Sequence, residues 1–156
     1  MPDRTIEITK TIEASPERVF RALTDADELS RWWTTRAESD PRVGGSFSYR
    51  WEFEEDTDRN HTREGTYLDV SPSEKVHYDW PMPLGNTVVD FHLEPSDAGT
   101  TLKLLHSGWG SGSEWVESTE MHRQGWGFFL DNLKGYLERG EDARASVMGL
   151  KTGAAV

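Results

Sequence analysis

Two histidines occupy positions from which a side chain could do chemistry. His106 shares a face with Leu102 and Leu104 if its strand is regular, and His122 lies one helical turn before Trp126. A buried neutral imidazole can orient a phenol or a carbonyl group, or act as a general acid or base. The alternative is a structural histidine whose ring nitrogens are satisfied by neighbouring groups. The sequence leaves both interpretations open.

Large rings recur along the chain and could line a site for a small apolar molecule. Seven residues are Trp, and aromatic residues make up 11% of the chain. Such sites are lined mainly by hydrophobic and aromatic side chains with a few polar groups, although the same rings could simply pack together as a core. The candidate ligand-binding residues are Trp33, Phe47, Tyr49, Trp51, Phe53, Tyr78, Trp80, Phe91, Leu104, His106, Trp109, His122, Trp126 and Leu130.

The glycine-rich segment Gly108-Trp109-Gly110-Ser111-Gly112 precedes a long helical pattern without a basic residue, unlike a phosphate-binding loop. We expect it to form a flexible entrance to a cavity, with Trp109 as a lid. The sequence has no cysteine, no His-Glu-x-x-His pattern, no Gly-x-Ser-x-Gly elbow and no dinucleotide fingerprint. We therefore assign no catalytic residue, no metal ligand and no cofactor.

The charge balance is acidic, because 17 Lys and Arg face 28 Asp and Glu for a net charge of −11. A negative surface repels phosphate backbones and anionic lipid headgroups, so we expect neither nucleic acid nor a membrane as partner. The acidic segment from Glu55 to Arg63 is typical of a solvated turn. The N-terminus lacks the apolar core of a signal peptide, and no apolar run approaches membrane-spanning length, which predicts a cytoplasmic location.

The first third of the chain predicts one strand followed by two short helices. Three isoleucines between residues 6 and 12 punctuate a polar stretch, which indicates a strand with one buried face. Ser15 can cap the next helix, and Pro16 suits its first position. A second short helix is expected at 27–33, with its aromatic end packed inward.

The middle of the chain predicts a series of antiparallel strands. Between residues 46 and 54 the pattern alternates cleanly, with Phe47, Tyr49, Trp51 and Phe53 on one face. Further strands are expected at 65–70, 75–80, 87–93 and 100–106. The breaks between them are rich in Pro, Gly, Asn, Asp and Ser, the usual turn formers.

A long C-terminal helix is expected over 114–139, where apolar residues recur at steps of three and four. Ser113 can serve as its N-cap and Gly140 can terminate it. Gly125 and Gly127 are costly inside a helix, so we expect them to allow close packing or a bend.

The elements together predict the α+β class, because a meander of short strands must bury its apolar face against another element. We expect a curved antiparallel sheet of about six or seven strands packed around the long C-terminal helix, with two short helices after the first strand. One domain would cover residues 1–140. The tail at 141–156 is weakly patterned, and we expect it to be weakly ordered.

The order of these elements resembles the START-like, or birch-pollen-allergen-like, superfamily, also called SRPBCC. Within it, the chain is similar to the family related to the C-terminal domain of the heat-shock-protein-90 ATPase activator. The segments that carry the resemblance are Ser15 to Thr24, Leu29 to Trp33, Asp40 to Phe47, Gly99 to Leu102, His106 to Gly108, and Gly125-Trp126. The resemblance covers nearly the whole chain, from about Ile6 to Gly140.

The resemblance implies a helix-grip fold, a single START-like domain over 1–140, and a cavity between sheet and helix. Our leading hypothesis is non-enzymatic binding of an apolar or aromatic small molecule in that cavity. One alternative is a cyclase- or aromatase-like enzyme that uses His106 or His122. Another is a co-chaperone-like module that regulates a heat-shock ATPase, and a homodimer is a further candidate assembly.

Overall fold

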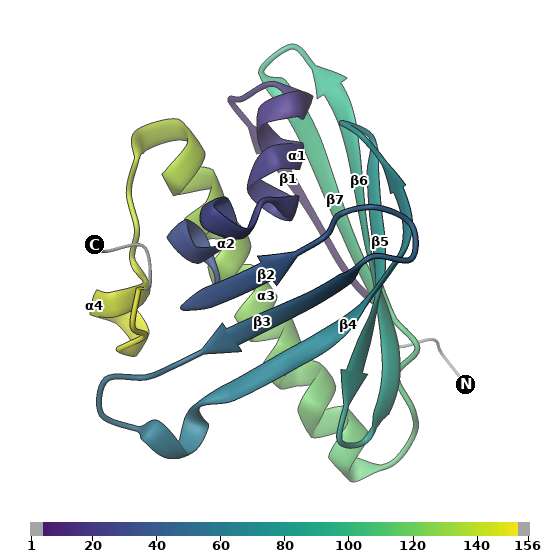
Figure 1. Cartoon of the computed structure of the whole chain (residues 1–156), viewed down its shortest axis with the longest axis vertical. Coiled ribbons are helices and arrows are strands. Elements are labelled where there is room, and N and C mark those ends of the chain that lie inside the picture. The colour runs from purple at the N-terminus through teal and green to yellow at the C-terminus, as the bar shows by residue number, and fades with distance from the viewer. Residues whose placement is uncertain (1–4, 153–156) are drawn as a thin grey trace.

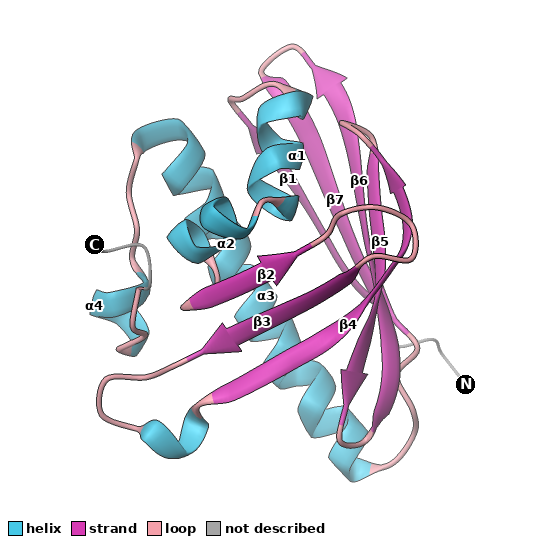
Figure 2. Cartoon of the chain, viewed as in Figure 1, coloured by secondary structure: helices cyan, strands magenta, loops and turns pink. Residues whose placement is uncertain are grey.

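A curved antiparallel sheet of seven strands wraps around one long helix (Figures 1 and 2), as expected for a helix-grip fold. The computed structural model describes residues 5–152. The strands are β1 (Ile6–Ile12), β2 (Arg36–Ser39), β3 (Ser46–Trp51), β4 (His61–Ser71), β5 (Lys75–Met82), β6 (Gly85–Ser96) and β7 (Gly99–Ser107). The helices are α1 (Pro16–Thr24), α2 (Ala26–Trp32), α3 (Ser113–Arg139) and α4 (Arg144–Met148), with a 3-10 turn, η1, at Thr57–Arg59.

The strand order is β1-β7-β6-β5-β4-β3-β2, so the first and last strands of the domain lie side by side. In that pair Ile6 faces His106 and Ile12 faces Thr100. The chain then crosses from β1 to the opposite edge of the sheet through α1 and α2, which lie on the same face as α3 (Figure 1). Three helices therefore cover the concave face. No helix within residues 5–152 is both long and apolar enough to cross a bilayer.

Helix ends follow local chemistry, with one exception. The Ser15 side chain accepts a hydrogen bond from the Arg18 amide at 3.2 Å, and Pro16 takes the first position of α1, as predicted. The expected end of α3 at Gly140 is also confirmed, since this residue adopts a left-handed φ of 66°. The expected N-cap is wrong: Ser113 is the first helical residue, and Gly112 precedes it without a side-chain cap.

β4 is longer than predicted because it changes partners. Its residues 61–66 pair with β3, whereas its later residues pair with β5. The change occurs near Gly65, where a Cβ atom would come within 2.5 Å of the Phe47 ring. The pairing of β4 with β5 starts only at Tyr67 opposite Tyr78, and the Asp79 carboxylate accepts the Thr66 amide at 2.7 Å. Beyond that point the two strands separate, which leaves room at one end of the sheet.

The turn expected at 81–86 is much tighter, because β5 continues to Met82 and pairs it with Gly85. Pro81 is tolerated there since β5 no longer pairs with β4 at that position. The four-residue strand β2 was not predicted, and β3 ends at Trp51, earlier than expected. Phe53 instead forms an isolated bridge with Leu150.

Residues 141–152 differ from the weak order expected for the tail. This segment contains α4, and its first residue, Arg144, is completely buried. The guanidinium donates to the Thr34 carbonyl at 2.7 Å, to the Ser30 carbonyl at 3.0 Å, and to the Asp142 carboxylate at 2.8 Å. A buried cation whose three nitrogens all donate hydrogen bonds leaves no periodic signal in the sequence, so pattern analysis misses it. The rest of the expected tail, 153–156, lies outside the described residues.

Candidate functional site

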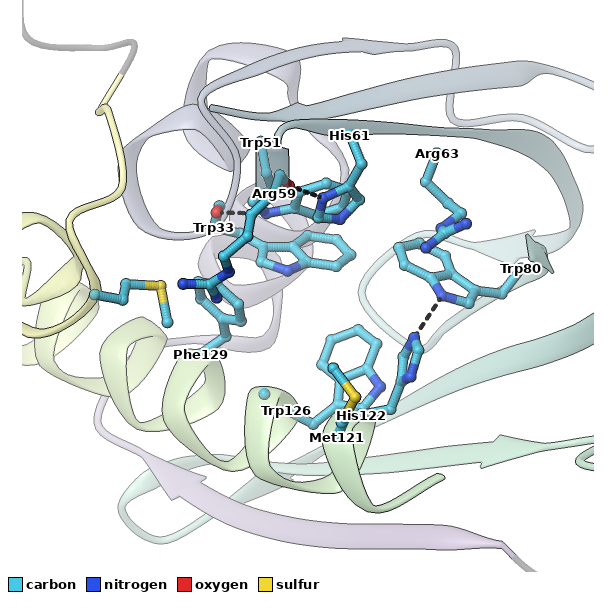
Figure 3. Close-up of a pocket in the computed structure, with 12 residues that line it drawn as sticks. Trp33, Trp51, Arg59, His61, Arg63, Trp80, Met121, His122, Trp126 and Phe129 are labelled. Atoms are coloured by element: carbon cyan, nitrogen blue, oxygen red, sulfur yellow. Dashed lines mark hydrogen bonds between the residues drawn. The ribbon is translucent and has the colours of Figure 1, made fainter. Parts of the chain in front are cut away.

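A pocket of about 350 Å³ lies between the opened end of the sheet and α3 (Figure 3). Its volume is at the lower end of the range of small-molecule sites, so it suits a guest of one or two rings. The lining residues are Trp33, Trp51, Arg59, His61, Arg63, Trp80, Met121, His122, Gly125, Trp126, Phe129 and Met148. They come from β3, β4, β5, η1, α3, α4 and the end of α2.

Four tryptophans form the apolar wall of this pocket, with Trp33 at their centre. Its ring lies 5.7 Å from Trp80 in a stacked arrangement, 5.2 Å from Trp126, and 5.4 Å from Trp51, centroid to centroid. These separations are typical of favourable aromatic pairs. Trp33 is the C-cap residue directly after α2, and its amide donates to the Leu29 carbonyl.

Hydrogen bonds hold three of these indoles in place. Trp51 Nε1 donates to the Trp33 carbonyl at 2.9 Å, and Trp126 Nε1 donates to His106 Nδ1 at 3.0 Å. Trp80 Nε1 approaches His122 Nε2 at 3.4 Å, a long contact (Figure 3). The rings are therefore oriented before any guest enters, which reduces the entropy lost on binding.

His106 lies behind this wall, is completely buried, and does not line the pocket. Its Nδ1 accepts the Trp126 N–H, so the proton sits on Nε2, which donates to Thr87 Oγ1 at 2.7 Å. The Thr87 hydroxyl in turn donates to the Trp80 carbonyl at 2.9 Å. Burial, reinforced by His122 and the Arg63 charge, lowers the pKa of His106 to about 2. The imidazole is neutral and both nitrogens are engaged.

His122 faces the pocket from α3 with a defined tautomer. Its Nδ1 contacts the Ser118 carbonyl at 2.9 Å, and because a carbonyl only accepts, Nδ1 carries the proton. Nε2 is then an acceptor whose only hydrogen bond within residues 5–152 is the long contact with Trp80. Burial lowers the pKa of His122, and the Arg63 charge lowers it further, so the ring is neutral near pH 7.

Arg63 in β4 is the cationic group at the same corner. Its guanidinium lies 5.6 Å from the centroid of the Trp80 ring, and Nη1 donates to the Pro81 carbonyl at 3.2 Å. That carbonyl is free to accept because β4 and β5 have separated. Nε is buried and has no hydrogen-bond partner in the described chain. Desolvation lowers the pKa of Arg63, yet an arginine stays protonated at neutral pH.

Arg59 and His61 line the other side of the opening. The Arg59 guanidinium lies 4.2 Å from the centroid of the Phe53 ring, and the His61 ring stacks on Trp51 at 4.9 Å. His61 Nδ1 donates to the Arg59 carbonyl at 2.8 Å. Desolvation and the neighbouring arginines, Arg63 foremost, lower the pKa of His61.

A family model described as activator of Hsp90 ATPase homolog 1-like protein matches residues 13–138. The chain belongs to this family. No curated protein matches it in sequence.

Solved structures share the fold of this Hsp90-activator-like chain over most of its length. Protein CV1439 from Chromobacterium violaceum is 26% identical, covers 88% of this chain and 99% of its own, and has a TM-score of 0.75. The Aha1 dimer from Colwellia psychrerythraea is 26% identical, and the match covers 88% of this chain and 98% of the Colwellia chain with a TM-score of 0.73. DynU16, from the dynemicin biosynthetic locus, is 22% identical, and the match covers 90% of this chain and 49% of DynU16 with a TM-score of 0.73. At this identity the match shows similarity of fold alone.

Five of the fourteen residues expected to bind a ligand line the pocket of this Hsp90-activator-like chain. They are Trp33, Trp51, Trp80, His122 and Trp126. Eight are buried outside the lining: Phe47, Tyr49, Phe53, Tyr78, Phe91, Leu104, His106 and Leu130. Trp109, the expected lid, is half-buried outside the lining and donates its N–H to the His106 carbonyl at 2.9 Å.

Seven lining residues were missed: Arg59, His61, Arg63, Met121, Gly125, Phe129 and Met148. A signal existed for three, because Met121, Gly125 and Phe129 recur at four-residue steps and so share one face of α3. For Gly125 and Gly127 we expected close packing or a bend, and close packing is wrong. Within residues 5–152, and apart from its chain neighbours and the backbone of its own helix, a Cβ atom at either position would meet nothing within 4 Å, and Gly125 instead lines the pocket.

Proposed function

We propose that this chain binds a small apolar or aromatic molecule in the pocket between the sheet and α3, without transforming it. The observation that carries the proposal is the wall of four tryptophans, three of them held by indole hydrogen bonds, around about 350 Å³ of space. Displacing water from such a wall supplies most of the affinity for an apolar guest. The family fold supports a ligand-binding or polyketide cyclase-like module.

The state of His106 favours binding over catalysis. Both of its nitrogens are engaged, and it lies behind the tryptophan wall, outside the pocket lining. To act as a base it would have to release the Trp126 N–H and leave a buried donor unpaired, which costs about 1–3 kcal/mol. A carrier needs no such rearrangement.

His122 carries the alternative of a cyclase-like enzyme. Its Nε2 lone pair lies at the pocket, and the 3.4 Å contact with Trp80 is its only hydrogen bond among the described residues. A substrate hydroxyl could donate to this nitrogen, which is the first requirement for a general base. Turnover that disappears in His122→Gln, while ligand affinity is kept, would establish catalysis and overturn the carrier proposal.

The description of the family, which names an activator of an Hsp90 ATPase, supports the alternative of a co-chaperone-like module. Stimulation of a heat-shock ATPase by the chain separates it from the other two, since neither a carrier nor a cyclase changes that rate. The dimeric relative from Colwellia makes a homodimer of this chain a further proposal. Light scattering of the purified protein tests it.

A matched pair of glycine variants tests the binding proposal. Gly125 and Gly127 are both helical, and added atoms meet open space at each, but only Gly125 lines the pocket. We expect Gly125→Leu to fill the pocket and weaken binding of aromatic probes at least about tenfold, the loss of roughly 1.4 kcal/mol. Gly127→Leu should leave binding unchanged.

Tryptophan fluorescence reports binding directly, because four of the seven Trp line the pocket. The wild-type chain would be titrated with one- and two-ring aromatics, flavonoids, fatty acids and sterols. If no compound changes the emission at micromolar concentration, or if both leucine variants bind as the wild type does, the proposed function is wrong.

A further inference from the structure

The charged groups that line the pocket are all of one sign. Among the described residues, Arg59 and Arg63 line it and no Asp or Glu does. The two histidines beside them, His61 and His122, have lowered pKa values and add no charge near neutral pH. This positive site lies in a chain with a net charge of −11, so its sign is opposite to that of the chain as a whole.

Arg63 is not explained by interactions within the protein. In the described chain Arg63 forms no ion pair. By contrast, Arg50 on the adjacent strand β3 contacts the Glu52 carboxylate at 2.9 Å. Its hydrogen bond to the Pro81 carbonyl uses one donor, and buried Nε has no partner within residues 5–152. A buried unpaired donor is costly and rare in folded proteins. An anionic group that enters the pocket at this corner would meet the guanidinium and compensate its unpaired charge.

The same charge excludes the other ligand class that an aromatic cage suggests. Several Trp faces around a pocket can bind an organic cation. Here two guanidinium groups line the site, no described carboxylate offsets them, and one of them already lies over the Trp80 ring. A cationic guest would be repelled, whereas an anionic guest would be attracted.

We propose that the pocket selects aromatic carboxylates, with the ring system against Trp33 and Trp126 and the carboxylate on the Arg63 guanidinium. A carboxylate fits best because its two oxygens match the planar fork of arginine. The volume of about 350 Å³ limits the ring system to one or two rings. This inference rests on the proposed function and specifies the chemical class of its ligand.

Isothermal titration calorimetry with three probes of one shape tests the inference. The probes are 2-naphthoate, neutral 2-naphthamide and cationic 2-naphthylmethylammonium. The wild-type chain should bind the carboxylate about tenfold or more tightly than the amide, the usual gain from a charge-assisted hydrogen bond, and bind the ammonium most weakly. The differences in affinity among the three probes should become smaller as the salt concentration is raised, because mobile ions screen the charge.

Variants then assign the preference to one side chain. Arg63→Gln should bring carboxylate and amide to equal affinity, and Arg63→Lys should restore part of the difference. Arg31→Gln, an exposed change on α2 with the same loss of charge, should leave the preference intact. Circular dichroism checks whether each variant is folded. If Arg63→Gln is unfolded, the inference is tested by the Arg63→Lys variant and by the order of affinities of the wild type for the three probes.

The outcomes separate the two proposals. Equal affinity of the wild type for carboxylate and amide overturns the present inference and leaves binding of an aromatic guest intact. A preference abolished by Arg59→Gln but unaffected by Arg63→Gln also overturns it. Failure of all three probes, together with failure of the wider fluorescence panel, overturns the proposed function itself.

Discussion

His106 and His122 have ring centroids 5.6 Å apart, yet their surroundings give them different roles. His106 connects the tryptophan wall to the sheet, since it accepts from Trp126 and donates to Thr87. His122 connects the same wall to the pocket opening. His106 thus fixes the position of the tryptophan wall, and His122 directs the lone pair of Nε2 toward the pocket.

The neutrality of His106 makes folding stability depend on pH. Its folded pKa of about 2 is far below the value near 6.5 of an unfolded chain. As the pH falls below 6.5, the unfolded chain binds a proton that the folded chain does not, so the free energy of unfolding decreases. For this one group the loss between pH 7.5 and 5.5 is about 1.4 kcal/mol.

Urea unfolding of the wild type and of His106→Gln at both pH values checks this expectation. Gln can still accept from Trp126 and donate to Thr87, but it cannot titrate. The variant should therefore lose about 1.4 kcal/mol less than the wild type between the two conditions. Parallel losses in both proteins would show that His106 is not the group responsible.

At the scale of elements, α3 contains a glycine whose replacement should be stabilising. Gly127 lies in the helix interior, and a Cβ there meets nothing within 4 Å. Gly127→Ala should raise the free energy of unfolding by up to about 1 kcal/mol, because glycine loses more backbone entropy on folding. Gly140→Ala is the contrasting variant: its φ of 66° suits glycine, so alanine there should destabilise. A loss of stability in Gly127→Ala would contradict the expectation.

The segment that carries α4 depends on Arg144. Replacing this buried guanidinium with Leu leaves the Thr34 and Ser30 carbonyls without their donor. It also removes the cation that, with Asn132, keeps the pKa of Asp142 low against the effect of desolvation. We expect a loss of about 2–4 kcal/mol in urea unfolding. Arg139→Leu, which removes an exposed pair with Glu141, should change the stability far less.

Proteolysis localises that effect. If α4 is held by Arg144, limited digestion of Arg144→Leu should cut first within residues 141–152, and the rest of the domain should persist. Since Met148 lines the pocket and Leu150 pairs with Phe53, affinity for aromatic probes should fall as well. Uniform digestion of the whole chain would argue against a local role.

Most elements could be predicted because their signals are local. Alternation at 46–54 and the cap at Ser15 depend on neighbours within one strand or one turn. The early start of β4 at His61 could not be predicted, since it depends on pairing with β3, a partner distant in sequence. The tryptophan wall was within reach of periodicity, but the cationic corner was not: Arg59 lies inside, and Arg63 at the end of, a segment whose acidic residues are typical of a solvated turn.

At the scale of the whole molecule, a net charge of −11 on 156 residues must be accommodated by the fold. The charges repel one another over distances up to a Debye length, about 10 Å at 0.1 M salt. Folding brings them closer together, so this repulsion destabilises the compact state at low ionic strength. Arg59 and Arg63 reduce this repulsion only near the pocket, since both lie at its opening.

Salt should therefore stabilise the protein, although it weakens individual surface ion pairs, which contribute little. We expect the melting temperature to rise between 20 mM and 500 mM KCl, by about 2–4 °C for each kcal/mol of repulsion that is screened. The control is Glu94→Lys with Glu117→Lys, two exposed positions whose reversal changes the net charge from −11 to −7. This double variant should melt higher than the wild type at 20 mM KCl and should gain less from added salt. A melting temperature that falls with KCl in the wild type would mean that favourable ion pairs outweigh the net repulsion.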